Sequence, residues 1–515
     1  MPGKKIAKIT RKVGRLVFSR FMIILLLFLL QIAVFVSILA WFSERLPWLT
    51  AVEQVFTVIM VLYLFNCRMD SSAKLTWMFL IALFPIPSAL LLVYTRTEVG
   101  KREISRTYAQ RIEETRGFIS GNAEQVPQSI SNLERYMNRE GMFPVYEQAF
   151  VTYYPLGDEA IPAMIREMEK AEHFIFLEFF IISEGHVWDQ VRDVLRRKAA
   201  EGVDVRVLYD GMCDVASLPT DFKSRLRREG IKVKAFFPLT AFVSTYYNYR
   251  DHRKILAIDN RVAFTGGVNL ADEYANEIVR FGHWKDTAIR VEGEAARSFT
   301  LMFLQMWNLI ETHRDYAPVH LAAPSGVPDV RKSPGLVLPF ADCPLDGDKV
   351  GESVYLDMLY RAEKYVHIMT PYLILDGEME TALAYAAQRG VDVKIILPGI
   401  PDKKGAYALA KSHYRTLTMS GVHLYEYEPG FVHAKVVSSD DVKAVVGTIN
   451  FDYRSLYHHF ECALYMQGTE CIADIEKDFA DTLARCRPVT MESIRAEKLG
   501  YKLAGSVLKL VAPLM

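Results

Sequence analysis

The sequence has little of what a metal centre, a disulfide framework or a nucleic-acid surface requires. Its six cysteines are scattered and form no Cys-x-x-Cys pair, which argues against a structural zinc site and against disulfide bridges. A His-Glu-x-x-His motif is absent, and the adjacent His458 and His459 would face opposite ways on a strand, so we expect no metal and no other cofactor. Basic and acidic residues number 61 each, and this zero net charge gives no general attraction for nucleic acid.

Long apolar runs are concentrated in the N-terminal part of the chain. Residues 21–42 contain no charge and are long enough to cross a hydrocarbon core of about 30 Å as a helix. Residues 75–94 form another run, whose two prolines predict a kink. Residues 47–66 are apolar in their centre but contain an acid, so they either span or lie at the interface. We therefore expect a transmembrane region at 21–94, with two or three helices.

The charges around these runs predict an orientation. Residues 1–20 are basic and contain no acid, so this tail should stay in the cytoplasm. Two spans would return the chain to the cytoplasm, whereas three would leave it outside. The basic residues after the last run favour the cytoplasmic side: Arg96, Lys101, Arg102 and Arg106. We expect residues 95–135 to be a juxtamembrane connector on that side.

The remainder of the chain predicts an α/β fold that is repeated in tandem. Strand-like runs alternate with amphipathic helical stretches, which is typical of mixed sheets flanked by helices. Three segments recur in the same order: 171–180 with 362–371, 202–211 with 390–399, and 230–238 with 421–429. We expect two related domains, at 136–322 and 323–495, joined through the proline-rich stretch 317–339.

Two further segments have open interpretations. Residues 239–250, LTAFVSTYYNYR, lengthen the first half and have no counterpart in the second. They form either a packed surface loop or an apolar lip beside the site. Residues 496–515 form an amphipathic C-terminal tail, which either lies in a membrane interface or packs as a final helix.

One motif occurs once in each half. Residues 252–269 read HRKILAIDNRVAFTGGVN, and residues 433–450 read HAKVVSSDDVKAVVGTIN. Both contain His-x-Lys-x4-Asp, then an apolar run, then a turn of small residues that ends in Asn. On a strand, a His and a Lys two residues apart point to the same face. We expect these residues to be catalytic: His252, Lys254, Asp259, His433, Lys435 and Asp440.

Two imidazoles beside two ammonium groups suit transfer at a phosphodiester. One neutral imidazole can attack phosphorus to give a phosphohistidine, while the other, protonated, donates to the leaving oxygen. The lysines neutralise charge on the phosphate oxygens without a metal. The turn residues can approach and bind the same oxygens, so we expect a substrate-binding role for Gly267, Asn269, Thr448 and Asn450.

The carboxylates that orient the imidazoles are harder to assign. Asp259 and Asp440 lie far along the strand from their histidines, and they either orient them or anchor the turn that follows. Asp286 and Glu461 are further candidates for orienting the imidazoles. The alternative for these two is an ordinary surface carboxylate.

The duplicated motif resembles that of the phospholipase D superfamily, and longer stretches resemble bacterial cardiolipin synthases. Those stretches are LEFFIISEGHVWD at 177–189, GGVNLADEY at 266–274, FGHWKDTAIRVEG at 281–293, LPFADCPLD at 338–346 and TINFDYRSLYHHFE at 448–461. The resemblance implies tandem, pseudo-twofold phospholipase D-like domains behind an N-terminal transmembrane helical anchor. It implies a multi-pass protein of the bacterial cell membrane, and the flanking basic residues described above favour the cytoplasmic face for its catalytic part.

The resemblance also implies the reaction. Two phosphatidylglycerol molecules, one donor and one acceptor, would give cardiolipin and glycerol through a phosphohistidine, with no cofactor. By analogy with the superfamily, His252 is the nucleophile and His433 the general acid and base, although the pseudo-symmetry also allows the reverse.

Two other functions share this fold. A membrane-anchored phosphodiesterase of the phospholipase D type, or a nuclease, would use water as the acceptor. The zero net charge and the hydrophobic N-terminal part argue against nucleic acid as a partner and for a lipid bilayer. A non-catalytic scaffold would not need two intact motifs.

Overall fold

The computed structural model describes residues 47–67, 69–96, 99–118, 131–139, 143–147, 149–238, 249–309, 311, 313–323 and 334–514. The chain divides into two compact units, Met1–Thr97 and Glu98–Met515. Residues 1–20, 21–42 and 239–248 lie outside the described residues, so the basic tail, the first expected span and most of the expected lip stay predictions.

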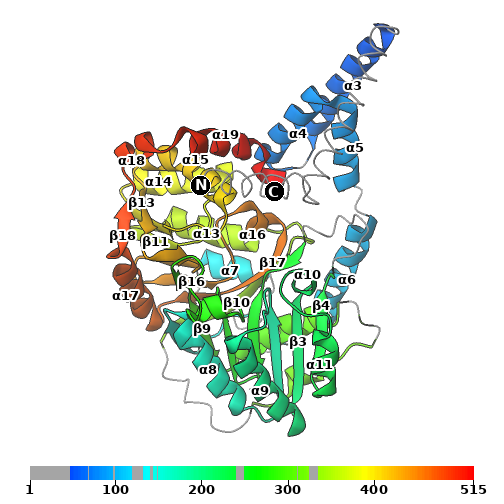
Figure 1. The fold of residues 1–515 in the computed structure, drawn as a ribbon, viewed down its shortest axis with the longest axis vertical. Coiled ribbons are helices and arrows are strands. Elements are labelled where there is room, and N and C mark those ends of the chain that lie inside the picture. Colours follow the sequence, from blue (N-terminus) through cyan, green and yellow to red (C-terminus); the bar gives the residue numbers. More distant parts are fainter. Residues whose placement is uncertain are drawn as a thin grey trace, which may run out of the picture. The chain divides into compact units, whose positions relative to one another are not determined.

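The first unit is helical where it is described. It contains α3 (Pro47–Asn66), α4 (Ser71–Leu83) and α5 (Pro85–Arg96) (Figure 1). The segment predicted as one kinked span is two helices that meet at Phe84. The Phe84 N–H still reaches Leu80 O at 2.8 Å, but Pro85 has no N–H to continue the ladder.

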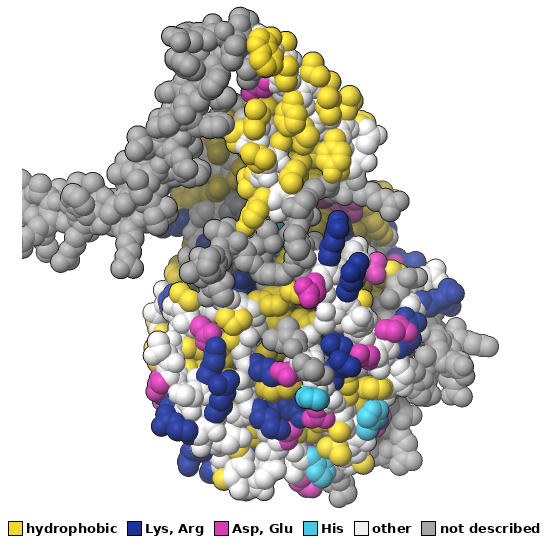
Figure 2. Space-filling view, turned by 90° about the vertical axis from the view of Figure 1, so that its right-hand side faces the viewer, with side chains coloured by type: hydrophobic (Ala, Val, Ile, Leu, Met, Phe, Trp, Pro, Cys, Tyr) yellow, Lys and Arg dark blue, Asp and Glu magenta, His cyan; other side chains and the backbone are white. Residues whose placement is uncertain are grey.

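Much of the surface of this unit is apolar. Val55, Phe65 and Leu90 are 60%, 72% and 65% exposed, and Figure 2 shows hydrophobic side chains over much of its visible face. Within the described residues, no helix combines the length and the apolar character needed to cross a bilayer. The transmembrane region at 21–94 therefore stays a prediction.

The second unit contains two sheets with the same strand order. Among the described residues, the first half forms a seven-stranded sheet in the order β1-β9-β7-β6-β2-β3-β4, and the order β9-β7-β6-β2-β3-β4 recurs in the second half as β17-β16-β15-β11-β12-β13. β2, β3 and β4 are parallel, as are β11, β12 and β13, and the other neighbours in these two orders are antiparallel. The predicted α/β repeat with mixed sheets is confirmed.

The strands have these bounds in the first half: β1 (Phe150–Tyr154), β2 (Phe174–Phe179), β3 (Asp204–Asp210), β4 (Lys232–Phe236), β6 (Lys254–Ile258), β7 (Val262–Gly266) and β9 (Ala288–Glu292). In the second half they are β10 (Leu336–Asp342), β11 (Tyr365–Met369), β12 (Asp392–Pro398), β13 (His423–Tyr427), β15 (Val436–Ser439), β16 (Lys443–Gly447), β17 (His459–Gln467) and β18 (Cys486–Pro488). β10 begins inside the stretch predicted to be a linker.

Helices cover both sheets because the central strands are apolar on both faces. β2 and β6, for example, are buried along their whole length. The outer face of the first sheet packs on α8 (Gly157–Glu169), α9 (His186–Ala200) and α11 (Phe222–Arg228), and that of the second on α13 (Val350–Arg361), α14 (Gly377–Gln388) and α15 (Lys404–Met419). Figure 1 shows α8, α9 and α11 beside β3. The two sheets share a further core with α12 (Ala295–Trp307) and α17 (Cys471–Leu483).

The remaining segments of this unit pack around that framework. They include α6 (Val99–Thr115), α7 (Asn132–Arg139), α10 (Cys213–Ala216), α16 (Tyr453–Tyr457), α18 (Met491–Ala496) and α19 (Leu499–Val511). α7 packs into the core of the second half through Leu133 and Met137, although it precedes the first half in sequence. α19 packs on α15, where Gly505 permits a close approach because a Cβ would lie 2.4 Å from Ala408 O.

Candidate active site

Two short strands cross between the halves just before the two motif histidines. β5 (Arg250–Asp251) of the first half pairs with β17, and β14 (Gly430–Val432) of the second half pairs with β8 (His283–Lys285). The ladder continues into the histidines, because His252 N donates to Phe460 O at 3.0 Å and His433 N donates to Lys285 O at 2.7 Å. The backbone of each histidine is thus held by the other half of the chain.

The side chain of His252, like its backbone, contacts the second half of the chain. Its Nδ1 lies 2.9 Å from both carboxylate oxygens of Glu461, and the two residues are 6% and 0% exposed. Thr448 Oγ1 donates to the same carboxylate. Glu461 holds the proton of this imidazole on Nδ1, which leaves the lone pair on Nε2. Thr448, which the sequence suggested as a substrate ligand, instead fixes the carboxylate.

His433 has the reciprocal arrangement. Its Nδ1 lies 2.6 Å from Asp286 Oδ2, and the side chains are 9% and 0% exposed. A Cβ at position 267 would lie 1.9 Å from Asp286 Oδ1 and 2.8 Å from His433 O. Gly267, expected to let the backbone approach substrate, is therefore required to make room for Asp286. The structure brings both suggested orienting carboxylates onto the imidazoles, each across the boundary between halves.

The two motif lysines, Lys254 and Lys435, add positive charge beside the histidine–carboxylate pairs. Lys254 Nζ donates to His252 O at 2.6 Å, and Lys435 Nζ lies 2.9 Å from His433 Nδ1. Each lysine is 1% exposed and interacts electrostatically with both Asp286 and Glu461, which places the two motifs in one site. Burial lowers the pKa of Lys254 to about 8 and the pKa of Lys435 to about 7.

Both imidazoles are neutral in the free site. Burial lowers the pKa of His433 to about 4 and holds the pKa of His252 well below its ordinary value. The paired carboxylates Glu461 and Asp286 oppose this shift, and the neighbouring lysine charges add to it. A neutral imidazole is the form that can attack phosphorus, so this environment prepares a nucleophile.

Aromatic rings cause much of this burial, and the sequence analysis named only one of them, His459, and only as an unsuitable metal ligand. Phe180 and His459 lie 4.9 and 5.4 Å from the ring centre of His252. Trp284 lies 5.6 Å from the ring centre of His433. A signal for two of them was present, since His459 precedes Glu461 by two residues and Trp284 precedes Asp286 by two.

The carboxylates of the two motif aspartates bind backbone N–H groups, which is the anchoring alternative that the sequence analysis left open. Each aspartate lies in the left-handed region, with φ of 54° at Asp259 and 58° at Asp440, and turns the chain after its strand. Each carboxylate accepts hydrogen bonds of 2.7 to 2.9 Å from three successive N–H groups at the start of a neighbouring strand: Glu172, His173 and Phe174 for the first, and Glu363, Lys364 and Tyr365 for the second. These aspartates anchor β2 and β11.

The two asparagines are placed differently. Asn269 Oδ1 accepts from Ile181 N at 2.9 Å, while its Nδ2 makes no hydrogen bond within the part of the chain that the structure describes. Asn450 Nδ2 lies 3.4 Å from Asp452 Oδ2. Asn269 therefore keeps a buried donor that suits a phosphate oxygen, whereas the amide of Asn450 faces a carboxylate.

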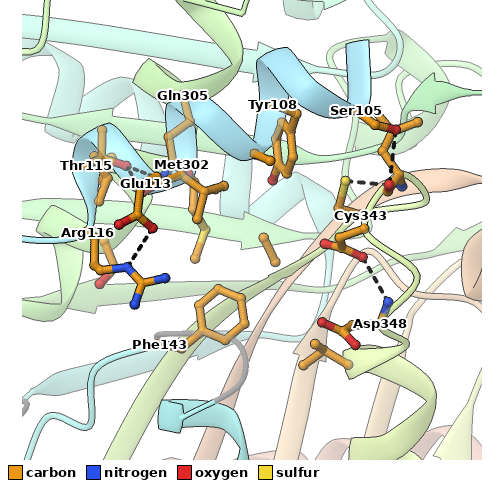
Figure 3. Close-up of a pocket in the computed structure, with 18 of the residues that line it drawn as sticks. Ser105, Tyr108, Glu113, Thr115, Arg116, Phe143, Met302, Gln305, Cys343 and Asp348 are labelled. Atoms are coloured by element: carbon orange, nitrogen blue, oxygen red, sulfur yellow. Dashed lines mark hydrogen bonds and ion pairs between the residues drawn. The ribbon is translucent and has the colours of Figure 1, made fainter. Parts of the chain in front are cut away.

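A cavity of about 900 Å³ lies within the second unit. It is lined by α6, α12 and the segment after β10, including Tyr108, Met302 and Cys343 (Figure 3). Arg253, between His252 and Lys254, points that way and reaches Met302 O at 3.4 Å. Several of the polar groups drawn in Figure 3 pair with one another, as Gln305 does with Thr115 at 2.8 Å. The motif histidines and lysines do not line this cavity.

Comparison with known proteins agrees with the geometry. A family model described as "Cardiolipin synthase, PLD-like domain" matches residues 164–307 and 355–483. An uncharacterized protein of Streptococcus mutans is 52% identical over 461 residues, which cover 88% of this chain and 99% of that protein. A cardiolipin synthase of Geobacillus kaustophilus is 34% identical over 384 residues, or 74% of this chain and 76% of that one. The crystal structure of the phosphatidylserine synthase of Haemophilus influenzae has the same fold, with a TM-score of 0.56 at 15% identity, covering 75% of this chain and 98% of that one.

Proposed function

Since the chain belongs to the cardiolipin synthase family with phospholipase D-like domains, and is a phosphatidyltransferase, we propose that it joins two phosphatidylglycerol molecules into cardiolipin and releases glycerol. The observation that carries the mechanism is the reciprocal pairing of His252 with Glu461 and of His433 with Asp286. It supplies two neutral imidazoles with Nε2 available, beside two buried ammonium groups.

The first step transfers a phosphatidyl group to the protein. His252 Nε2 attacks phosphorus of the donor lipid, and the bond from phosphorus to the headgroup glycerol oxygen breaks. His433 gives its proton to that oxygen, and glycerol leaves. The bound phosphodiester anion favours the protonated form of His433 at this stage. Lys254, Lys435 and the amide of Asn269 offset the charge on the non-bridging oxygens.

The second step returns the site to its starting state. The terminal hydroxyl of the second phosphatidylglycerol attacks phosphorus, and His433 takes its proton. The nitrogen–phosphorus bond breaks, which releases cardiolipin and neutral His252. One phosphodiester is exchanged for another, so the reaction needs no external energy source. Water in place of the second lipid would give the alternative, a phosphodiesterase.

We place this reaction at the bacterial cell membrane, with the catalytic part on the cytoplasmic face and a helical anchor at 21–94. The uncharged run at 21–42, the exposed apolar side chains of α3 to α5 and the basic residues after them support this placement. The outer face of α19 supports it too, because Leu499, Leu503 and Val507 are 69%, 59% and 66% exposed.

Product analysis tests the proposal. The purified full-length chain is incubated in mixed micelles with phosphatidylglycerol as the one phospholipid, and the products are identified by mass spectrometry. We expect equal amounts of cardiolipin and glycerol from the native chain and none from His252→Ala. The control His423→Ala removes an exposed imidazole on β13 and should leave turnover unchanged. Phosphatidic acid without cardiolipin would overturn the proposal in favour of the phosphodiesterase.

A further inference from the structure

A third imidazole lies beside the proposed nucleophile and has no part in the mechanism above. His459 opens β17, is 8% exposed and lies with its Nδ1 3.7 Å from Glu461 Oε1. Neither of its ring nitrogens has a hydrogen-bond partner among the described residues. A buried polar side chain without a partner is costly, so its ring nitrogens are suited to a bound ligand.

The three side chains at this point have the donors of a metal site. His252, His459 and Glu461 each offer one ligand atom, and these atoms all lie within 4.8 Å of one another. Bonds of 2.0 to 2.1 Å to a tetrahedral zinc ion separate neighbouring ligands by about 3.3 Å. The contacts that Glu461 makes with His252, at 2.9 Å, and with His459, at 3.7 Å, lie on either side of that value. Small side-chain rotations would therefore close the site.

We propose that His252, His459 and Glu461 form an inhibitory site for a divalent transition metal, with zinc as the best match. Two imidazole nitrogens and one carboxylate oxygen are the ligands that zinc takes in many proteins, with a water or a substrate oxygen in the fourth position. This inference concerns a metal that opposes the reaction. It leaves the cofactor-free mechanism intact.

The inhibition would follow from the tautomer of His252. In the metal-free site its proton is on Nδ1, which faces Glu461, and the lone pair on Nε2 is available for phosphorus. A metal bound at Nδ1 takes that lone-pair position, so the same proton moves to Nε2. His252 then has no lone pair to attack with, and removal of the metal reverses the change.

The other half of the site lacks the same third ligand. Trp284 occupies, two residues before Asp286, the place that His459 occupies before Glu461. The indole packs 5.6 Å from the ring centre of His433 and is no metal ligand. The pseudo-twofold site is therefore asymmetric. A third metal ligand, His459, lies beside His252, whereas Trp284 stands at the equivalent position beside His433.

Cobalt binding tests the site without relying on the proposed function. The full-length chain in detergent micelles is freed of metal with a chelator and titrated with Co²⁺, whose visible absorption reports coordination, and then with Zn²⁺ as a competitor. Phosphatidylglycerol turnover is measured in parallel. We expect one saturable Co²⁺ signal that Zn²⁺ removes, and turnover that falls with Zn²⁺ occupancy and returns with the chelator.

Variants of His459 assign the site. His459→Phe keeps a ring against His252 and His459→Gln keeps a polar group, and each should weaken Co²⁺ and Zn²⁺ binding at least about tenfold. The matched control is His458→Gln, which should bind as the native chain does.

Unchanged metal binding in the His459 variants, or bound zinc without loss of turnover, would overturn the proposal. Should neither variant fold, anomalous diffraction at the zinc edge from the native chain decides, and an ion found elsewhere would overturn it. A chain that binds Co²⁺ at these residues but makes no cardiolipin even after the chelator has removed the metal would disprove the proposed function and leave the metal site standing.

Discussion

The Nδ1 atom of His252 lies 2.9 Å from the carboxylate of Glu461, which stands 209 residues later in the chain. His433 makes the reciprocal contact with Asp286 at 2.6 Å. Each half therefore supplies the histidine of one pair and the carboxylate of the other, so neither half holds a complete histidine pair. This exchange explains in physical terms why the chain carries the motif twice.

Removing the charge of Glu461 should impair catalysis without disturbing the fold. Glu461→Gln keeps the size of the side chain, but its amide can donate to Nδ1 of His252 and place the remaining proton on Nε2. We expect kcat to fall by roughly 10² to 10⁴, the range found when a group that fixes a histidine tautomer is lost. The matched control is Glu476→Gln, because Glu476 pairs with His367 Nδ1 at 2.8 Å outside the site. A kcat for Glu461→Gln equal to that of the control would contradict the orienting role.

The sequence predicts the motif residues and the repeat well because both are local patterns. His252, Lys254 and their counterparts stand out through spacing alone, and the recurring segments predict two related halves, which the repeated strand order confirms. The crossing of β5 onto β17 is a tertiary pairing that leaves no local signal, so Asp286 and Glu461 could be suggested but not assigned to particular histidines. The motif aspartates are the opposite case, because they have a clear sequence signal that does not by itself reveal their role. Their spacing is regular because the turn needs it, and only the structure shows their carboxylates on backbone N–H groups.

The covalent intermediate should form on His252. A phosphatidyl donor with a p-nitrophenol leaving group departs without a proton, so it bypasses His433 in the first step. In His433→Ala the second step lacks its base, and we expect a phosphatidyl adduct to accumulate on the peptide that contains His252, detected by mass spectrometry. His252→Ala should form none. An adduct on His433 in the His252→Ala chain would show that the two roles are reversed.

The reaction should lose efficiency at mildly alkaline pH. Burial lowers the pKa of Lys435 to about 7, so this ammonium group loses its charge, and its hold on the phosphodiester, as the pH rises through that value. His433 must gain a proton when the donor binds, and because its pKa in the free site is about 4, kcat/KM already declines below pH 7. We expect this decline to become steeper above about pH 7, where Lys435 loses its charge. Lys435→Arg keeps its charge, so the fall in kcat/KM that the loss of the Lys435 charge causes should move to higher pH. A native profile that is flat to about pH 9, where an ordinary lysine still holds its proton, would contradict the assignment.

Asp259 and Asp440 should matter for stability more than for turnover. Each replacement by Asn removes charge-assisted hydrogen bonds to three N–H groups, and each such bond contributes about 1.5 to 3 kcal/mol. Asp259 is 0% exposed while Asp440 is partly exposed, so Asp259→Asn should lower the free energy of unfolding more, by about 2 to 4 kcal/mol. Thermal unfolding in micelles measures the loss, and kcat per folded molecule should stay near the native value. A large fall in kcat at an unchanged unfolding temperature would show that Asp259 takes part in catalysis.

The outer face of α19 should lie in the surface of an anionic bilayer. Leu499, Leu503 and Val507 are spaced four residues apart and form one exposed stripe, while Gly505 faces α15. α19 itself contains no acid, and Lys498 and Lys502 lie at its N-terminal end, next to Leu499 and Leu503 in sequence, which suits phosphatidylglycerol headgroups, while Lys509 pairs with Glu380 at 3.4 Å.

Spin labelling checks this contact even if other segments also hold the chain at the membrane. The half-buried Cys67 and Cys486 are changed to Ser, and a nitroxide is attached at Leu503→Cys or, as the control, at the exposed Gln190→Cys on α9. In phosphatidylglycerol vesicles we expect the label at 503 to be shielded from a water-soluble nickel reagent and accessible to oxygen, because it lies at the boundary of headgroups and acyl chains. The label at 190 should be accessible to nickel. Equal nickel accessibility at the two positions would show that the stripe remains in water and that α19 serves only to pack on α15.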